Sequence, residues 1–496
     1  MPRKRGASLS DTIAPSTPSG KIAELRRELG LLDLVFLNVV AITGIRWLAS
    51  ASRYGAASLT LWLLAFAAFF VPQGLAVTEL STRYPEEGGI YVWTKKAFGD
   101  FHGFVCGWCY WINNLLYFPG LLAFTVGNAV YIGGTRIQHL GESKVFVTSL
   151  SLLFFWFVIL LNVRGLGAGK WLQNLGAVGT WLPALVLILM GASAYYMFGS
   201  ANPFSLKGLK PEVSFSTLNY WSQMCFAFAG LELASIMGGE IRDPRRNIPR
   251  GVLIGGILIA VIYISGSLSI YIAVPSREVS VVSGVMQAIA EVTSRVGVVW
   301  ILSAMALLLT ISGLGGTSAW VAGSARIPFV AGLDRYLPPA FGKVHPRYGS
   351  PYVAILAQGV ISSLFIATGY FGGSVEEAYL TLVSVTLIVY FIPYLYLFAA
   401  TAILRSREGL RAEIIAIPGG VMGTAACSAL GFLTTATAIL VALVPPPEAT
   451  NVVVFEMKVV GGCLLCFVSG AVLYLRARRA KSAPPPAPAG SPTLHP

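Results

Sequence analysis

Recurring apolar segments are the feature that most constrains what this chain can fold into. Stretches of about 20 predominantly apolar residues follow one another along its 496 residues, each closed by a short polar or charged loop. A helix of about 20 residues matches the hydrocarbon core of a bilayer, which is roughly 30 Å thick. The chain is also 55% hydrophobic and only 11% charged, unlike ordinary soluble domains. The sequence therefore predicts an all-α integral membrane protein.

About twelve transmembrane passes are expected, and no segment between them is long enough for an independent soluble domain. They cover roughly residues 31–54, 58–80, 102–132, 146–163, 172–198, 219–239, 250–274, 297–323, 350–371, 376–402, 416–443 and 452–475. Lysine and arginine concentrate in alternate loops and at both chain ends. By the positive-inside rule, both termini are predicted to be cytoplasmic. We expect a multi-pass protein of the inner (plasma) membrane, with the lipid bilayer as its partner.

Other functional classes are disfavoured by the distribution of reactive and charged residues. The net charge of +13 is spread over membrane-flanking loops and forms no stripe for nucleic acid. The four histidines are scattered outside any catalytic motif, and the six cysteines lie in or beside apolar helices, as packing thiols do. We therefore expect no enzyme activity, no metal and no organic cofactor. Residues 1–30 are expected to form a cytoplasmic segment, and the proline-rich residues 477–496 a disordered cytoplasmic tail.

Two helices are expected to be broken in mid-membrane. The first break would be "ITGIR", Ile42 to Arg46, and the second "FAFAGLE", Phe226 to Glu232. Each has a central glycine closely followed by an ionisable residue, and each helix opens a block of about five passes. This pattern predicts an inverted repeat, residues 31–198 and 199–402, with two further helices in 403–476. The alternative is that Gly44 and Gly230 only allow close helix packing.

Broken helices have a direct chemical use. The N-terminus of the half-helix after a break presents unpaired N–H groups and a positive dipole end, which suit a carboxylate. The carbonyl end before the break suits an ammonium group. A free amino acid carries both groups, so the two breaks predict an amino acid as the ligand.

Three loop segments resemble the amino acid, polyamine and organocation (APC) transporter family. They are "TELSTRYPEEGGIYVWTKKAFG" from Thr78, "FAFAGLELASIMGGEIRDPRRNIPRG" from Phe226 and "GSARIPFVAGLDRYLPPAFGKVHPRYGSPY" from Gly323. The resemblance runs from about Leu31 to Arg476. Within the family the glutamate:GABA antiporter branch looks nearest, through "SGVMQAIAEV", "AWVAGSAR", "VYFIPYLYLF" and "IPGG".

This resemblance implies a LeuT-like fold, alternating access and a central amino-acid site. On matched positions it implies that the two breaks line the substrate backbone, that two aromatic residues form walls or gates, and that a sixth-helix glutamate serves gating or coupling. The implied substrate contacts are Ile42, Thr43, Gly44, Ile45, Arg46, Asn114, Phe226, Ala227, Gly230, Trp320 and Tyr390, and the implied coupling residue is Glu232. Arg46 departs from the family pattern, which is more often aromatic or apolar there, so the substrate stays open.

Charged residues inside the membrane are expected to be functional because of their insertion cost. Three roles remain open for Arg46: binding an anionic group of the substrate, pairing with Glu232, or reaching toward the outer interface. Glu232 is a proton carrier, the partner of Arg46 or a structural hydrogen-bond acceptor. Glu79, Glu86 and Glu87 stand at the predicted cytoplasmic edge and are expected to anchor loops or be solvated.

The sequence thus predicts an amino acid permease or antiporter, with an exchanged amino acid or a proton as possible second partner. The alternative from another class is a membrane sensor that binds an amino acid on the same fold without net transport. The lack of a large predicted cytoplasmic domain favours the transporter.

Overall fold

The computed structural model describes residues 25, 27–133, 137–279, 284–298, 300–368, 375–409, 413–444 and 452–482. Within these ranges the regular structure is helical, apart from one isolated parallel bridge between Leu29 and Ile241. Most of the predicted N-terminal segment, and the predicted tail from residue 483 onward, lie outside the described residues.

The helices follow one another along the chain in two groups. The first comprises α1 (Leu31–Ile42), α2 (Arg46–Arg53), α3 (Ala57–Ala65), α4 (Val71–Arg83), α5 (Ile90–Phe98), α6 (Asp100–Ala129), α7 (Lys144–Val163), α8 (Leu166–Phe198) and α9 (Leu206–Leu209). The second comprises α10 (Phe215–Ala227), α11 (Leu233–Ile236), α12 (Pro244–Ala273), α13 (Gly284–Val296), α14 (Trp300–Ser324), α15 (Arg326–Leu333), α16 (Tyr352–Thr368), α17 (Val375–Glu408), α18 (Gly420–Ala442) and α19 (Val452–Ser482). A π-helical turn, Phe66–Phe70, joins α3 to α4, and short 3-10 turns cover Gln138–Glu142, Gly238–Glu240, Ser276–Glu278 and Pro339–Gly342.

Each predicted pass coincides with a helix or with two helices in succession. Among the described residues, eight spans are long and apolar enough to cross a membrane, and the bent pair α1–α2 would make a ninth. The shorter α16 is also apolar. The predicted all-α, multi-pass membrane fold is therefore confirmed. One boundary differs: α19 remains helical to Ser482, past the predicted start of the disordered tail at residue 477.

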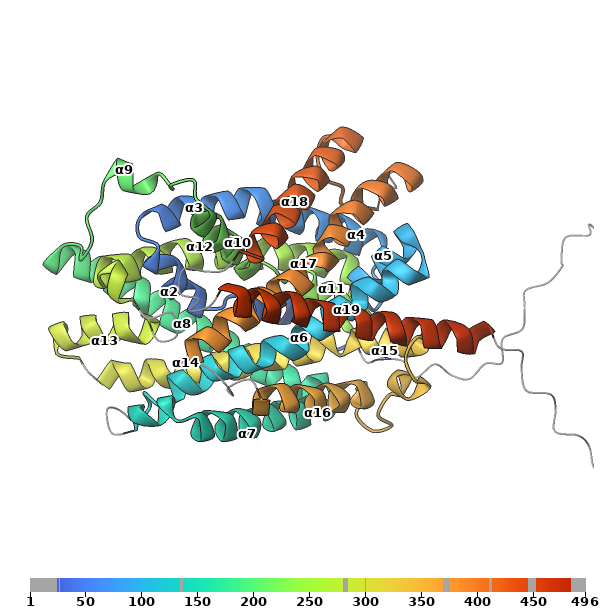
Figure 1. Ribbon diagram of the computed structural model, residues 1–496, viewed down its shortest axis with the longest axis horizontal. Helices are drawn as coiled ribbons and strands as arrows, with labels where there is room; N and C mark the ends of the chain where they lie inside the picture. Colours follow the sequence, from blue (N-terminus) through green and yellow to red (C-terminus); the bar gives the residue numbers. More distant parts are fainter. Residues whose placement is uncertain are drawn as a thin grey trace, which may run out of the picture.

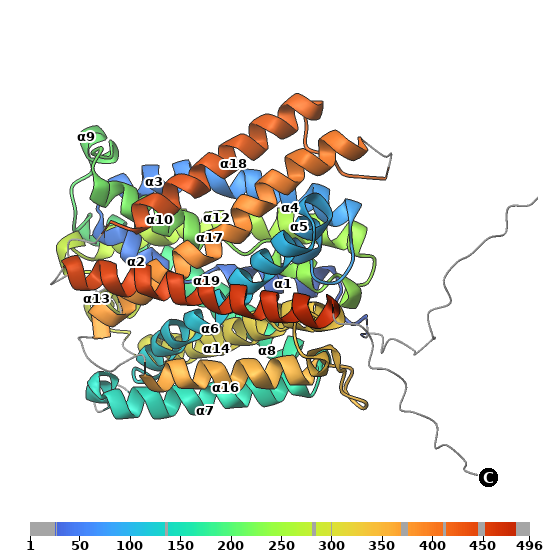
Figure 2. The ribbon, with the colours of Figure 1, turned by 45° about the vertical axis from the view of Figure 1, so that its right-hand side comes forward.

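The long helices form a bundle around a central group of α1, α6, α8 and α14. Most long helices run in a similar direction, with α7 and α16 side by side along one edge in both views and α17 with α18 along another (Figures 1 and 2). Helix α14 packs against α8, α6 and α1. Large apolar side chains such as Leu160, Leu189, Leu253 and Leu465 are exposed on the bundle surface, where lipid would cover them.

Local signals set several helix ends. Ser143 and Ser214 precede α7 and α10, and their hydroxyls accept the backbone N–H groups of Phe146 and Thr217. Such caps satisfy donors that have no partner inside the helix. Pro72 does not start a separate helix, because it lies just after the π-helical turn through which α3 continues into α4. Of these signals, the Ser214 cap sets the start of α10, the helix that leads into the second break.

Candidate functional site

The first interruption separates α1 from α2. Helix α1 ends at Ile42, α2 begins at Arg46, and the two are bent by 44°. The Gly44 N–H donates to the Ile42 carbonyl at 2.7 Å and to the Tyr263 hydroxyl at 3.0 Å. A Cβ at Gly44 would lie 2.6 Å from Trp47 Cδ1. The break thus occurs at the predicted glycine, which leaves room for the tryptophan ring.

The second interruption separates α10 from α11. Helix α10 ends at Ala227 and α11 begins at Leu233. Between them Gly230 has a φ of +129°, a backbone region nearly restricted to glycine. A Cβ there would meet Ile42 Cγ1 at 2.9 Å and the Trp320 ring at 3.3 Å. The two breaks therefore pack directly against each other.

Tyr263 of α12 joins the two breaks through one hydroxyl group. Its oxygen lies 2.6 Å from the Ile42 carbonyl and 2.9 Å from the Ala227 carbonyl, so its single proton is shared between the last turns of α1 and α10. The same oxygen accepts the Gly44 N–H. Sequence analysis missed this residue because a single tyrosine in an apolar helix carries no signal of its partner.

Replacing Tyr263 with phenylalanine should therefore loosen both breaks. The change leaves two buried carbonyls and one N–H without this partner, at about 1–3 kcal/mol for each group that stays unsatisfied. We expect a lower midpoint of thermal unfolding in detergent together with weaker ligand binding. Tyr271→Phe is the matched control, because Tyr271 lies on the same helix and donates to the Pro203 carbonyl at 2.7 Å, away from both breaks. Equal binding by the two variants would contradict this role.

Two adjoining cavities lie at the breaks, and every predicted contact except Gly230 lines one of them. The first is lined by Ala41, Ile42, Trp47, Asn113, Asn114, Tyr117, Phe226, Ala227, Ala229, Trp320 and Tyr390. The second is lined by Val40, Ala41, Thr43, Gly44, Ile45, Arg46, Tyr117, Leu121, Phe124, Ser312, Gly313, Gly316 and Trp320. Ala41, Tyr117 and Trp320 line both cavities. The structure thus brings together residues from α1, α2, α6, α10, α14 and α17.

The polar groups of the two cavities differ in character. In the second cavity the Arg46 guanidinium lies over the rings of Trp47 and Tyr117, at 4.8 and 4.7 Å from their centres. In the first, the amide oxygens of Asn113 and Asn114 are buried and lack a hydrogen-bond partner within the described part of the chain. A cation and free acceptor oxygens at adjoining positions suit a ligand with both an anionic group and N–H donors.

Glu232 lies beside the cavities at the centre of a hydroxyl cluster. Its carboxylate is fully buried and accepts hydrogen bonds from one glutamine and three tyrosines: Gln73 at 3.1 Å, Tyr110 at 2.9 Å, Tyr390 at 2.8 Å and Tyr394 at 2.6 Å. Arg46 is not among these four donors. Sequence analysis missed Gln73, Tyr110 and Tyr394, which come from α4, α6 and α17 and meet only in the fold.

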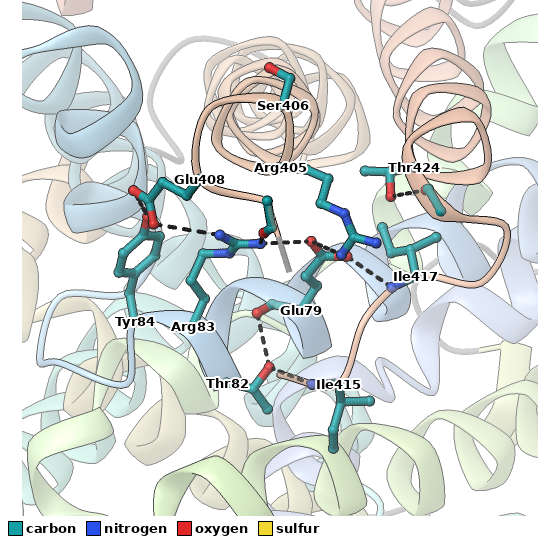
Figure 3. Close-up of polar contacts among 12 residues, drawn as sticks. Glu79, Thr82, Arg83, Tyr84, Arg405, Ser406, Glu408, Ile415, Ile417 and Thr424 are labelled. Atoms are coloured by element: carbon teal, nitrogen blue, oxygen red, sulfur yellow. Dashed lines mark hydrogen bonds and ion pairs between the residues drawn. The ribbon is translucent and has the colours of Figure 1, made fainter. Parts of the chain in front are cut away.

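A second buried carboxylate, Glu79, lies nearer the end of α4. Its Oε1 accepts from Arg405 at 3.0 Å and is 3.5 Å from the Arg83 guanidinium, and its Oε2 accepts the Ile417 N–H at 2.8 Å (Figure 3). Arg83 also donates to the Gly409 carbonyl at 2.8 Å. Glu79 thus joins α4, the end of α17 and the segment leading to α18, which agrees with the loop-anchoring role expected from the sequence.

Comparison with known proteins identifies the family. The family model described as amino acid permease matches residues 29–465. The chain belongs to the amino acid permease family. An uncharacterized transporter of Legionella pneumophila is 32% identical over 89% of this chain and 95% of its own length. A probable agmatine/putrescine antiporter of Lactococcus lactis is 26% identical over 71% of this chain and 74% of its own.

A further relative bears on the branch that the sequence resembles. A glutamate/gamma-aminobutyrate antiporter of Lactococcus lactis is 25% identical over 82% of this chain and 81% of its own length. The family and these relatives are transporters, and the antiporters among them exchange small amino acids or amines, as their names state. The protein is therefore a multi-pass membrane transporter of the amino acid permease family.

Proposed function

We propose that this protein is a secondary transporter of a free amino acid and that it works by alternating access at the two helix breaks. The observation that carries the proposal is that residues of both breaks line a single cavity, with Ile42 on one side and Phe226 and Ala227 on the other. A ligand held there touches both interrupted helices, so a change in their relative position alters its contacts. A substrate shifts such an equilibrium only through different interaction energies in the two states.

The substrate contacts proposed for the cycle follow the polarity of the cavities. Arg46 would bind an anionic group of the substrate, and the amide oxygens of Asn113 and Asn114 would accept from its amine. Trp320 and Tyr390 would form the aromatic walls, supported by ring centroids 6.0 Å apart and a T-shaped contact. Glu232, linked by a 2.8 Å hydrogen bond to Tyr390, would sense closure of that wall.

We also propose the membrane arrangement that this cycle requires. Residues 31–198 and 199–402 form two repeats, α18 and α19 lie outside them, and both termini face the cytoplasm from the plasma membrane. The names of the two antiporter relatives support exchange, in which a second amino acid, or its decarboxylated amine, returns in the opposite direction.

Reconstitution tests the proposal directly. Purified protein is first screened by thermal shift against the common amino acids and their decarboxylation products, because a ligand that binds the native state raises its apparent stability. Stabilising compounds are then tested as radiolabelled substrates in liposomes, with and without unlabelled substrate inside. Uptake that depends on internal substrate supports an antiporter. Binding without any uptake would instead favour the sensor alternative.

Arg46 supplies the sharpest test of substrate class. Arg46→Ala should weaken the binding of anionic amino acids about 10- to 100-fold. A hydrogen bond to a charged group contributes about 1.5–3 kcal/mol, and 1.4 kcal/mol is a factor of ten. The affinity for neutral amino acids should change much less. Competition for uptake in liposomes measures both, and Arg53→Ala at the end of the same helix is the control. Equal losses for anionic and neutral amino acids would show that Arg46 does not recognise an acidic side chain of the substrate.

A further inference from the structure

A buried charge cluster outside the cavities consists of Glu87, Glu240 and Arg326, here called the Glu87 cluster. Glu87 lies in the loop between α4 and α5, Glu240 in the turn after α11, and Arg326 at the start of α15. Arg326 pairs with both oxygens of Glu240, through Nε at 2.7 Å and Nη2 at 3.0 Å. Its Nη1 donates to the Ala322 carbonyl. Glu240 and the backbone therefore engage all three nitrogen atoms of the guanidinium.

Glu87 is the second carboxylate beside this one arginine. Its Oε2 accepts the Gly239 N–H at 2.8 Å. Its Oε1 lies 3.8 Å from Arg326 Nε and, within the described residues, has no hydrogen-bond partner. The side chain is 14% exposed, whereas the neighbouring Glu86 is 53% exposed and lies 3.5 Å from Lys96. With both carboxylates ionised, the cluster would carry an uncompensated negative charge in a nearly buried position.

The charges around Glu87 favour its neutral form. Burial and the negative charge of Glu240 raise the pKa of Glu87 well above its usual value, opposed by Arg326 and the Gly239 N–H. Burial also raises the pKa of Glu240, with a small contribution from Glu28, while its pairing with Arg326 lowers it. The bidentate pairing with Arg326 stabilises the ionised form of Glu240. A single proton shared by the two carboxylates therefore binds to Glu87.

The cluster joins segments that continue directly from the proposed transport site. Glu240 follows α11 and the second break, Arg326 follows Trp320 of α14, and the loop of Glu87 follows α4. The Gly88 N–H donates to the Ile236 carbonyl at 2.9 Å. A Cβ at Gly238 would lie 2.3 Å from the Pro85 carbonyl oxygen. A movement of α11 relative to α15 would therefore pull Glu87 from its buried partners and expose it to water.

We propose that Glu87 is a proton-binding site, separate from the substrate cavity, that holds a proton while the segments after α4, α11 and α14 are packed together and releases it when they part. The inference rests on the alternating access proposed above. Because the packed state binds this proton more tightly than the parted state, falling pH favours the packed state. The preference for the packed state is complete below the ordinary carboxyl pKa of about 4.3. It is lost as the pH rises through the higher pKa that Glu87 has in the packed state.

Hydrogen–deuterium exchange of the full-length protein without substrate tests the site independently of transport. Peptides covering residues 236–241 and 86–90 are followed from about pH 5 to about pH 8, after correction for intrinsic exchange. In the wild type, protection should fall with rising pH, by about tenfold for each unit that separates the two pKa values. Glu87→Gln retains an acceptor for Gly239 and should make protection independent of pH. Glu86→Gln, the matched control, should retain the wild-type profile.

A second variant keeps the proposal testable if Glu87→Gln does not fold. Glu240→Gln removes the competing charge and frees Arg326 for Glu87, so the pH profile should move to lower pH. A wild-type profile in Glu87→Gln or an unshifted profile in Glu240→Gln would overturn the proposal, as would a wild type without pH dependence. If the wild-type protein shows this exchange pattern but transports no amino acid in liposomes, the proposed function is refuted and the proton site is still supported.

Discussion

Gly230→Leu should abolish substrate binding and transport while the protein still inserts and purifies. Gly230 has a φ of +129°, and a Cβ there would already lie 2.9 Å from Ile42 and 3.3 Å from Trp320. A leucine would force strained backbone and fill the space between the two breaks. Even alanine should weaken binding about 5- to 150-fold, because such backbone strain costs about 1–3 kcal/mol and 1.4 kcal/mol is a factor of ten.

Matched variants separate this effect from a general loss of folding. Gly461→Leu on α19 is the control, because within the described structure a Cβ at Gly461 would meet no atom within 4 Å. Gly44→Ala tests the first break. A Cβ there would lie 2.6 Å from Trp47 Cδ1, so the tryptophan ring would have to move. Thermal shift and liposome uptake are measured on the same preparations. Normal uptake by Gly230→Leu would show that the breaks are not the substrate site.

Glu79→Ala should cause a large loss of stability. The Glu79 and Arg405 side chains are 1% and 2% exposed and are joined at 3.0 Å. Removing one member of a buried ion pair leaves the other charge uncompensated, which costs about 3–5 kcal/mol. The Ile417 N–H loses its acceptor as well. We expect a strongly lowered midpoint of thermal unfolding, measured in detergent by fluorescence and by size-exclusion chromatography.

The design of the Glu79 experiment distinguishes a buried pair from a surface one. Glu413→Ala removes the exposed pair between Arg245 and Glu413, at 2.7 Å with side chains 51% and 77% exposed, and should change stability by at most about 1 kcal/mol. The double variant Glu79→Leu/Arg405→Met should recover part of the loss, because apolar replacement of a whole buried pair is often tolerated. An equal midpoint of thermal unfolding for Glu79→Ala and Glu413→Ala would show that the buried pair of Glu79 and Arg405 contributes no more stability than the exposed pair.

The sequence located both breaks because their cause is local. A glycine in the middle of an apolar helix, followed by an ionisable residue, is visible without any knowledge of the fold, as at Gly44 and Gly230. The side chains that surround Glu232 carried no such signal. Gln73, Tyr110 and Tyr394 belong to three separate helices, and a tyrosine on an apolar helix looks the same whether its hydroxyl meets a carboxylate or lipid headgroups.

The same division holds for the charged residues. Sequence spacing showed that Arg46 and Glu232 each follow a break, and an ion pair between them was one of three roles left open for Arg46. The fold instead gives Glu232 four other donors and lays Arg46 over Trp47 and Tyr117. It likewise assigns Arg326 to Glu240 and leaves Glu87 beside the pair.

The amino-acid sequence was enough to predict that the chain crosses a membrane many times as helices, because backbone groups in lipid must be satisfied within each segment. It was also enough to predict the family and where two of the helices are interrupted. Which polar groups meet in the interior became known only from the folded arrangement. A helix satisfies its own backbone hydrogen bonds and so leaves the partners of its side chains to be set by packing between segments far apart in the chain.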